Sequence, residues 1–391
     1  MPATTSRLHL SDIAPSVIQS EIRAMSVLCE AAGGINLAQG ICDTDLPDPV
    51  AQGAIDAIQT GHNIYTRLDG IAPLRETIAH KLARYNGLTV DPATQVLVTN
   101  GATGALYASL LALLNPGDEV LLFEPFYGYH VSTLNSLRMK PVPVPLAAPD
   151  WSLDLDALRA AITPRTRALI LNTPSNPSGK IFTRAESEAL AALALEHDIF
   201  VFTDEIYEYF LFDGQQHLSL ATLPGMAERT ITISGLSKTF SITGWRIGYL
   251  AAAPQWINAI GYFHDLTYVC APAPLQHGAA AGLHQLTDAN FYTSLASEYQ
   301  SKRDLLCQAL TDAGLPPSIP SGAYYVLADA SRVPGATARD KARDLLQSTG
   351  VAAVAGSAFF RPGRGEHLLR FCFGKKDADL ARACDQLRSL T

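Results

Sequence analysis

The chain has 391 residues, of which 48% are hydrophobic and 17% are charged, and its formal net charge is −8. This length predicts two domains, or three small ones, and the composition excludes wholesale disorder. The acidic balance and the lack of a basic run lead us to expect no nucleic-acid partner.

The sequence predicts a cytoplasmic protein without a membrane span. The longest apolar run, 105–114, is shorter than the roughly 18 residues that a span needs. The N-terminal stretch MPATTSRLHLSD lacks the apolar core and the cleavage site of a signal peptide. The six cysteines are scattered and form no C-x-x-C pair. This pattern disfavours a zinc site and a disulfide framework, so we expect reduced thiols and no bound metal.

Short β-branched runs alternate with helical patterns through the middle of the chain. Such runs predict strands at 96–99, 119–123, 168–171, 199–202 and 230–233, with helices at 101–114 and 184–196. Strands that are apolar on both faces and alternate with helices predict a mostly parallel sheet covered by helices on both faces. Ligands bind such α/β sheets at the carboxyl ends of the strands.

The C-terminal third has a different pattern. A long helical stretch at 290–313 ends at Gly314 and a proline pair, and shorter strands and helices follow. We interpret this part as a second, smaller α+β domain. The first forty or so residues show no strand–helix alternation and are assigned to the same domain. The predicted division is therefore a large domain at 46–289 and a small domain made of 1–45 and 290–391.

Four segments carry polar residues directly after predicted strands. They read TNGATG at 99–104, NTPSNPSG at 172–179, TDEIY at 203–207 and SGLSKTF at 234–240, and the last runs on to GWRIG at 244–248. With LAQG at 37–40 and LRF at 369–371, this order of motifs resembles the class I/II aminotransferases of fold type I, which use pyridoxal phosphate (PLP). The resemblance covers nearly the whole chain. It implies that the large domain binds PLP.

Lys238 is the predicted catalytic residue. A lysine becomes a Schiff-base nucleophile when its surroundings lower its pKa, and this one follows an apolar strand among small hydroxyl residues. A solvated surface lysine is the ordinary alternative for a lysine taken alone. The resemblance implies that Lys238 binds PLP covalently and moves the proton between the substrate Cα and the cofactor C4′.

Three further residues are predicted to hold the cofactor ring. Asp204 ends a strand, and a buried carboxylate there would keep the pyridine nitrogen protonated. The resemblance implies that Tyr207 and Asn176 both donate to the 3-oxygen of the ring. The ordinary alternatives are a helix cap for Asp204, packing for Tyr207 and turn chemistry for Asn176.

The phosphate group needs hydrogen-bond donors and positive charge. Gly101, Ala102 and Thr103 open a helix after a strand, where free backbone N–H groups can bind an anion. Arg246 lies eight residues after the lysine and would bind the phosphate bidentately, with Ser237 adding a hydroxyl.

One departure from the family lies beside the phosphate site. Many relatives carry serine where this chain has Gly235, and the neighbouring Ser234 is the candidate substitute.

Tyr65 resembles the tyrosine that reaches the phosphate from the neighbouring subunit. We therefore expect a homodimer with shared active sites.

An aromatic side chain is expected on the face of the ring. The resemblance assigns this role to Tyr127, although Phe126 or Tyr129 would also fit. Two departures fall near the substrate: the run ICDTD at 41–45 replaces a common Pro-Asp-Phe pattern, and Phe360 stands where many relatives carry glycine.

Arg370 lies in an apolar strand, where an arginine is costly unless it is paired. Its fork-shaped guanidinium matches a carboxylate. The resemblance implies that it binds the α-carboxylate of the substrate, helped by the backbone of Gly40 and the side chain of Asn176. A structural ion pair is the ordinary alternative.

These residues predict a PLP-dependent aminotransferase that moves an amino group from an L-amino acid to a 2-oxo acid by a ping-pong mechanism. Segments 40–46 and 125–130 contain no Lys or Arg, which favours a neutral or aromatic donor over aspartate. A carbon–sulfur β-lyase of the same fold stays open as an alternative. A non-catalytic PLP-binding protein is less favoured, because the chain is acidic and a regulator of that kind would bind DNA.

Overall fold

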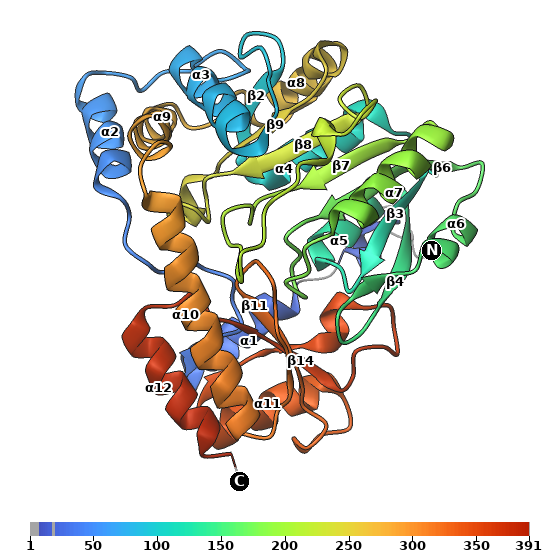
Figure 1. Ribbon diagram of the computed structural model, residues 1–391, viewed down its shortest axis with the longest axis vertical. Coiled ribbons are helices and arrows are strands. Elements are labelled where there is room, and N and C mark those ends of the chain that lie inside the picture. The colour runs from blue at the N-terminus through green and yellow to red at the C-terminus, as the bar shows by residue number, and fades with distance from the viewer. Residues whose placement is uncertain (1–7, 18–19, 391) are drawn as a thin grey trace, which may run out of the picture.

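The computed structural model describes residues 8–17 and 20–390. An eight-stranded sheet fills the upper part of the molecule in Figure 1, and a four-stranded sheet lies in the lower part. The strands of the large sheet are, in chain order, β2 Val96–Asn100, β3 Glu119–Glu124, β4 Lys140–Ala147, β5 Ser152–Leu153, β6 Thr166–Asn172, β7 Phe200–Asp204, β8 Thr230–Gly235 and β9 Ile247–Ala251.

The large sheet is mostly parallel, as predicted. Its spatial order is β2-β9-β8-β7-β6-β3-β4-β5. The neighbours from β8 to β4 pair in parallel, whereas β9 is antiparallel to both β2 and β8, and β5 is antiparallel to β4. The carboxyl ends of β6, β7 and β8 therefore meet at one edge of the sheet.

Helices cover both faces of this sheet because successive side chains of a strand point in opposite directions. Leu121 packs in one apolar cluster with α6 and α7, and the next residue, Leu122, packs in another with α4, α5 and α8. A third cluster joins β2 and β9 to α2, α3 and α9. The helices are α2 Asp48–Gln59, α3 Ala72–Lys81, α4 Gly101–Leu113, α5 Gly128–Ser136, α6 Leu155–Ala160, α7 Arg184–Glu196, α8 Pro254–Tyr268 and α9 Ala273–Leu286.

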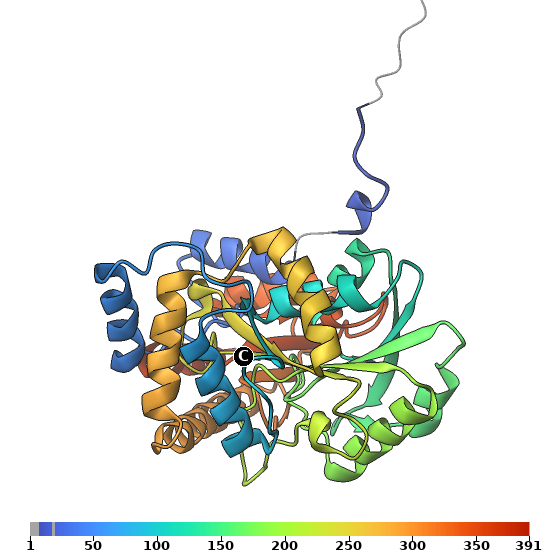
Figure 2. The ribbon, with the colours of Figure 1, turned by 90° about the horizontal axis from the view of Figure 1, so that it is seen from above.

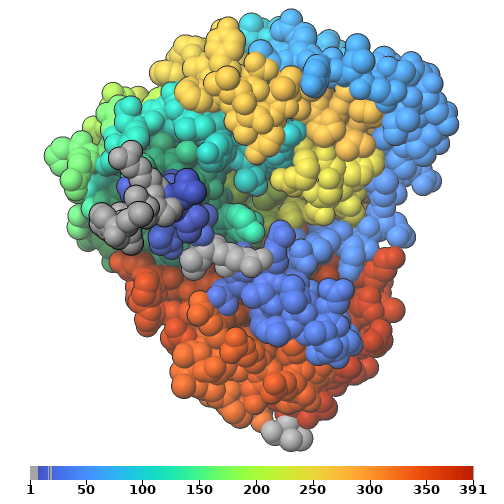
Figure 3. All heavy atoms as spheres, turned by 180° about the vertical axis from the view of Figure 1, so that it is seen from behind, coloured from blue at the N-terminus to red at the C-terminus, as the bar shows by residue number. Residues whose placement is uncertain are grey.

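The lower part is built on an antiparallel sheet with the order β10-β11-β14-β13. The N-terminal segment joins it: β1 pairs in parallel with β12, and seen from behind, the blue residues of α1 lie against the orange and red C-terminal part (Figure 3). The elements here are α1 Glu21–Ala31, β1 Ile35–Asn36, α10 Phe291–Asp312, β10 Pro317–Ser318, β11 Tyr325–Asp329, α11 Ala338–Thr349, β12 Val351–Ala352, β13 Val354–Ala355, β14 Leu368–Cys372 and α12 Asp377–Arg388.

Helix ends follow the local sequence. Thr183 and Glu186 form a capping box at the start of α7, and Thr337 and Asp340 form another at α11. Before α1, a short turn (Ala14–Ser16) lies against α5, and Figure 2 shows the chain at 8–13 extending away from the rest. In the described part of the chain, every helix is too short or too polar to cross a membrane.

Candidate active site

A cavity of about 540 Å³, here called the inner cavity, lies at the carboxyl ends of β6, β7 and β8. Most of the predicted site residues line it, although they come from distant parts of the sequence. Those in its wall are Gly40, Ala102, Thr103, Tyr127, Asn176, Asp204, Tyr207, Ser237, Lys238, Arg246 and Arg370.

Lys238 follows β8, and its Nζ donates a hydrogen bond of 2.9 Å to the backbone oxygen of Gly40. Burial is the main reason that the pKa of Lys238 lies below its ordinary value, and the cationic side chains of Arg246 and Arg370 lower it further. A lowered pKa favours the neutral amine, which is the nucleophilic form. Because Lys238 lies in the wall of the inner cavity and its Nζ is bonded to Gly40, the solvated-surface alternative is wrong for this lysine.

Asp204, the last residue of β7, has its carboxylate 3.0 Å from Nε2 of His130. Its backbone oxygen accepts a hydrogen bond of 3.0 Å from the side chain of Asn172 at the end of β6. Asn172 in turn accepts a hydrogen bond of 2.7 Å from the backbone N–H of Asn176. Through Asn172, these contacts fix Asp204 and Asn176 relative to each other at the ends of neighbouring strands.

The Tyr207 hydroxyl is buried and lies 3.0 Å from the hydroxyl of Tyr325. Burial is the main reason that the pKa of Tyr207 lies far above its ordinary value, and the neighbouring phenol of Tyr325 raises this pKa further. The hydroxyl therefore stays protonated and can donate. On Asn176, the side-chain oxygen accepts from Arg370 at 2.9 Å, which leaves its amide N–H groups as donors.

Ala102 and Thr103, in the first turn of α4, line the inner cavity, and the first N–H groups of a helix have no partner within the helix. Gly101 has a φ of +70°, and a Cβ there would lie 2.6 Å from Nη2 of Arg246, so a side chain would collide with the guanidinium. Arg246 is also anchored by its Nη1, which donates to the Thr243 backbone oxygen at 3.0 Å. A helix N-terminus, an arginine and the nearby Ser237 together form an anion site.

Ser234, the candidate to replace the serine that this chain lacks at Gly235, does not line the inner cavity. The Ser234 hydroxyl is buried and donates a hydrogen bond of 2.8 Å to Glu208, on the other side of the strand from the inner cavity. The reason is the alternation of side chains along β8, which turns Ser234 toward the protein interior.

Tyr127 presents its ring to the inner cavity beside two other rings. The ring of His130 meets it edge-on at 5.2 Å, and the ring of Tyr129 stacks on it at 5.3 Å. Phe126, the third aromatic of this segment, belongs to the apolar core instead. Tyr129 also lines the inner cavity, but Tyr127 contacts His130, the partner of Asp204, and it stays our prediction for the residue that covers a ligand ring.

Arg370 is fully buried in β14 of the small sheet. Its Nη2 donates to the backbone oxygen of Ala38 at 2.5 Å, and the rings of Tyr325 and Phe359 lie 4.3 Å and 4.8 Å from its guanidinium carbon. Among the described residues its Nε has no hydrogen-bond partner and no carboxylate pairs with it. A buried cation without a counterion is costly, so the structural ion pair is excluded and a ligand carboxylate would complete the site.

Tyr65 lies elsewhere. Its side chain is 79% exposed and is not in the wall of the inner cavity. The adjacent loop is held to α9, where Gln276 donates a hydrogen bond of 3.1 Å to the Thr66 hydroxyl.

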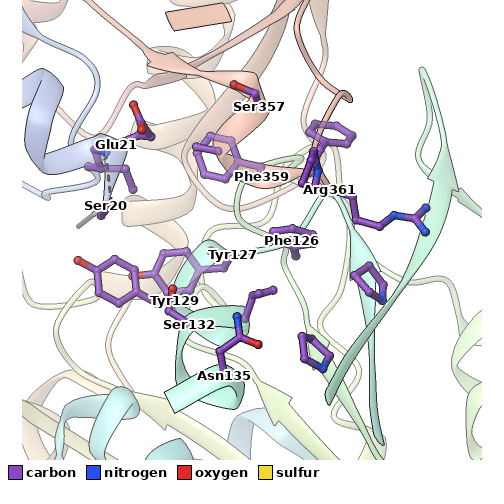
Figure 4. A pocket seen from close by; sticks show the side chains of 18 of the residues that line it. Ser20, Glu21, Phe126, Tyr127, Tyr129, Ser132, Asn135, Ser357, Phe359 and Arg361 are labelled. Carbon is purple, nitrogen blue, oxygen red and sulfur yellow. Dashed lines mark hydrogen bonds between the residues drawn. The ribbon is translucent and has the colours of Figure 1, made fainter. Parts of the chain in front are cut away.

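The two departures from the family pattern flank the inner cavity. Ile41 lines it, whereas Cys42 is buried in the core of the lower part. Phe360 lines a second, larger space of about 1290 Å³, which we call the outer cavity. Figure 4 shows this space with Ser20 and Glu21 on one side and Tyr127 and Tyr129 facing them.

Several residues of the inner cavity received no role from sequence reasoning, and three of them carry polar side chains next to predicted site residues or add charge. His130 pairs with Asp204, Tyr325 contacts Tyr207, and Arg23 of α1 adds a cation. The signal for His130 is its spacing of three residues from Tyr127 at a helix start, which places both on one side of the helix. The other two come from the lower part. Tyr325 ends the segment 321–325, which resembles a small-domain landmark of the family and is interpreted from sequence as architecture, and Arg23 belongs to none of the motifs.

A buried charged cluster lies behind Asp204 and Tyr207. In the described part of the chain, Glu205, Glu208 and His217 are the one group whose spacing could suit a metal ion. Lys81 already pairs with Glu208 at 2.5 Å, and His217 pairs with Glu205 at 2.7 Å. Two carboxylates thus face an ammonium and an imidazole, and the cluster is balanced by the protein's own charges.

The donors and acceptors of the inner cavity fit PLP. Asp204 offers a carboxylate for a protonated pyridine nitrogen, Tyr207 offers a protonated hydroxyl for the ring oxygen, and Tyr127 offers an aromatic face. The start of α4 with Arg246 offers an anion site for the phosphate, and Lys238 offers an amine for the aldehyde carbon.

Comparison with known proteins agrees with this geometry. The family model of aminotransferase class I and II matches residues 32–387. The probable N-succinyldiaminopimelate aminotransferase of Mycobacterium tuberculosis is 40% identical, with 94% of each chain covered. Aromatic-amino-acid aminotransferase 2 of Thermococcus litoralis is 35% identical, with 98% of each covered.

The solved structures that resemble this chain are also aminotransferases. The N-succinyldiaminopimelate aminotransferase structure from Mycobacterium tuberculosis has a TM-score of 0.94 at 38% identity, covering 98% of this chain and 100% of that chain. An Escherichia coli protein described as having a methionine aminotransferase function has a TM-score of 0.92 at 33% identity, covering 98% of this chain and 100% of that chain. The chain therefore belongs to the class I and II aminotransferases and is a transaminase that uses pyridoxal phosphate.

Proposed function

We propose that this transaminase takes a neutral or aromatic L-amino acid as donor and passes the amino group to a 2-oxo acid in a ping-pong cycle. The observation that carries the proposal is Arg370, a buried guanidinium that pairs with no carboxylate of the described residues and shares the inner cavity with Lys238. Arg370 would bind the carboxylate common to all α-amino and 2-oxo acids. The amine of Lys238 would then be placed at the substrate Cα.

Bound PLP supplies an electron sink that stabilises negative charge at the substrate Cα. Asp204, held by His130, would keep the ring nitrogen protonated. Lys238, with its lowered pKa, would take the proton from Cα and return it at C4′. Tyr207 would donate to the ring oxygen.

The donor preference is supported by the wall where a side chain would lie. Ile22, Ile41, Leu106 and Tyr129 line the inner cavity and suit apolar groups. The relatives include an aromatic-amino-acid aminotransferase and a protein with a methionine aminotransferase function.

We also propose a homodimer with shared active sites, in the cytoplasm. The loop before α3 exposes Ile64 and Tyr65, and α8 exposes Tyr262 and Leu266. Exposed apolar side chains of this size are available for burial at a subunit interface. The six free cysteines support the cytoplasmic location.

The division into a large domain at 46–289 and a small domain of 1–45 and 290–391 remains our proposal for the chain.

The test is half-transamination of the PLP-loaded enzyme across a panel of amino acids, followed by absorbance as the aldehyde form of the cofactor is converted to the amine form. Steady-state kcat/KM for aspartate, methionine, phenylalanine and alanine with one acceptor ranks the donors. A tenfold lead for aspartate, about 1.4 kcal/mol in the transition state, contradicts the donor preference. Release of pyruvate and ammonia without an acceptor would instead indicate β-elimination.

A further inference from the structure

Tyr325 brings a phenol hydroxyl to the wall of the inner cavity, and the proposed function assigns no role to that hydroxyl. Tyr325 is the first residue of β11 in the lower part of the molecule, and it is 2% exposed. A buried hydroxyl is costly unless a partner binds it. The contacts of this one therefore show what it can do.

The small sheet fixes the direction of the Tyr325 side chain. In the pairing of β11 with β14, Tyr325 lies opposite Cys372 and Leu327 lies opposite Arg370. Tyr325 and Arg370 are therefore diagonal neighbours on one face of the sheet, and the Arg370 guanidinium carbon lies 4.3 Å from the Tyr325 ring. A Cβ at Gly40 would collide with the Tyr325 hydroxyl, so glycine leaves the space in which this hydroxyl lies.

The Tyr325 hydroxyl has one hydrogen-bond partner among the described residues, the hydroxyl of Tyr207, at 3.0 Å between the two oxygens. Each phenol carries one proton and can both donate and accept. When Tyr207 donates its proton to the ring oxygen of the cofactor, the proton between the two phenols has to come from Tyr325. The two hydroxyls then form a chain in which each donates toward the cofactor.

Among the described side chains that act on Tyr325, none is an anion that would compete for its proton. Its charged and titratable neighbours are Tyr127, Tyr207, Tyr324, Arg370 and Cys372. Burial is the main reason that the pKa values of these phenols and of the thiol lie above their ordinary values, so they are neutral at pH 7. Tyr207 is thus the acceptor that the site offers to Tyr325.

We propose that Tyr325 is a positioning residue that acts through Tyr207: its hydroxyl donates to Tyr207 and so directs the Tyr207 proton onto the ring oxygen of the cofactor. This inference rests on the proposed roles of Tyr207 and Lys238. Hydrogen bonds in a chain polarise one another, so the Tyr325 hydroxyl strengthens the bond that Tyr207 donates. Because its ring lies on Arg370, the same side chain borders the ring site and the carboxylate site.

The chain of two phenols has an electrostatic consequence at the cofactor. When the lysine-bound cofactor loses its proton, negative charge remains on the ring oxygen. A hydrogen bond donated to that oxygen stabilises the charge and lowers the pKa of the lysine-bound cofactor. Removal of the Tyr325 hydroxyl should therefore raise this pKa.

The experiment measures the pH midpoint of the visible absorption band of the PLP-loaded enzyme. Tyr325→Phe removes the hydroxyl and keeps the ring on Arg370. It should raise the midpoint by about 0.3–1 pH unit, or about a two- to tenfold change in proton affinity. Tyr207→Phe should raise the midpoint further. The double variant Y207F/Y325F should have the midpoint of Tyr207→Phe, because Tyr325 acts through Tyr207.

Two further measurements separate this role from a general disturbance of the site. Calorimetric binding of 3-phenylpropanoate, a carboxylate that cannot react, should change by no more than about twofold in Tyr325→Phe, because the ring still packs on Arg370. The matched control is Tyr292→Phe, at a half-buried tyrosine that lines neither cavity. Its midpoint should equal that of the wild type.

The outcomes distinguish this inference from the proposed function. A shift in Tyr207→Phe without one in Tyr325→Phe overturns the inference and leaves the role of Tyr207 intact. Shifts that add in the double variant also overturn it, since Tyr325 would then act independently of Tyr207. A large loss of 3-phenylpropanoate binding in Tyr325→Phe overturns it as well. A midpoint that no variant changes contradicts the role of Tyr207 itself, and the inference falls with it.

Discussion

Arg370 donates a hydrogen bond of 2.9 Å to the side-chain oxygen of Asn176, and this contact joins the small sheet to the large one. Arg370 lies in β14, and Asn176 lies in the loop after β6. The residue proposed to bind the substrate carboxylate and a residue proposed to bind the cofactor ring are therefore direct partners. A substrate carboxylate that binds Arg370 would therefore also affect the position of Asn176 at the ring site.

Arg370→Lys should lower kcat/KM for every donor by about 10- to 100-fold, because lysine cannot form the two-pronged pair with a carboxylate. Cofactor binding should change little. Steady-state kinetics with alanine, methionine and phenylalanine checks the first point, and PLP titration checks the second. Arg159→Lys, at an exposed pair with Glu196, is the control. Unchanged kcat/KM values would remove Arg370 from the substrate site.

Lys238 should carry the cofactor covalently. Borohydride reduction of the PLP-loaded enzyme followed by peptide mapping should place the label on the peptide that contains SGLSKTF. Lys238→Ala should bind PLP without the reducible bond. A label on another lysine ends the assignment.

Asp204→Ala should bind PLP through the phosphate site yet lose at least about 100-fold in kcat, because the ring nitrogen is no longer held protonated. His130→Phe should give a smaller loss, since the aspartate remains but loses its 3.0 Å partner. Single-turnover absorbance changes measure both. A near-normal kcat in Asp204→Ala would exclude this role.

Mixing two defective chains tests the shared site. Lys238→Ala and Tyr65→Ala homodimers should each have low activity at limiting PLP. Hybrids contain one site with both native residues, so refolded mixtures should recover up to about a quarter of the wild-type activity if each site combines the two chains. Sedimentation gives the oligomeric state. A fully active monomer, or mixtures without recovery, would contradict the shared site.

The buried cluster predicts a pH dependence of stability. Burial by itself lowers the pKa of His217, but the Glu205 carboxylate at 2.7 Å, with Glu208 nearby, raises it above its ordinary value despite the opposing charge of Lys81. The folded state thus holds a proton that the unfolded state releases near pH 6.5. The stabilising contribution of His217 is complete below about pH 6.5 and is lost as the pH rises through the raised value.

Denaturant unfolding at a series of pH values measures this contribution. The wild type should lose about 1.4 kcal/mol for each unit by which the pKa is raised, and His217→Gln should lack that slope. His197→Gln, at a more exposed histidine, serves as the control. Equal slopes in the wild type and in His217→Gln would contradict the assignment.

The sequence predicts the part of the fold that depends on local pattern. The helix at 184–196 is found as α7, and the predicted strand at 199–202 is β7, shifted by one residue at its start and extended to Asp204. β4 escapes prediction because Pro141, Pro143 and Pro145 alternate within it. Prolines at every second position all lack their N–H on one side of the strand, so the other side still pairs with β3.

The candidate site is predictable where it follows strand ends and is not where it depends on contacts between the two parts of the molecule. Asp204 and Lys238 could be placed from their own segments. Arg23 and Tyr325 enter the inner cavity through the packing of the lower part, which no local period encodes. Ser234 shows that a residue within a motif can also be placed wrongly from sequence, because the direction of its side chain depends on which face of β8 it occupies.

The segment that begins at Asp204 carries two interleaved pairs of polar residues. Asp204 and Tyr207 face the inner cavity, while Glu205 and Glu208, each one residue later, face the buried cluster with Lys81. A one-residue shift that moved Asp204 and Tyr207 to the positions of Glu205 and Glu208 would place a tyrosine where Glu208 pairs with Lys81, and it would leave the ring site without its acid. The buried ion pairs of the cluster therefore fix which side chains of this segment face the inner cavity. We expect that an insertion or a deletion in this segment would disrupt the site.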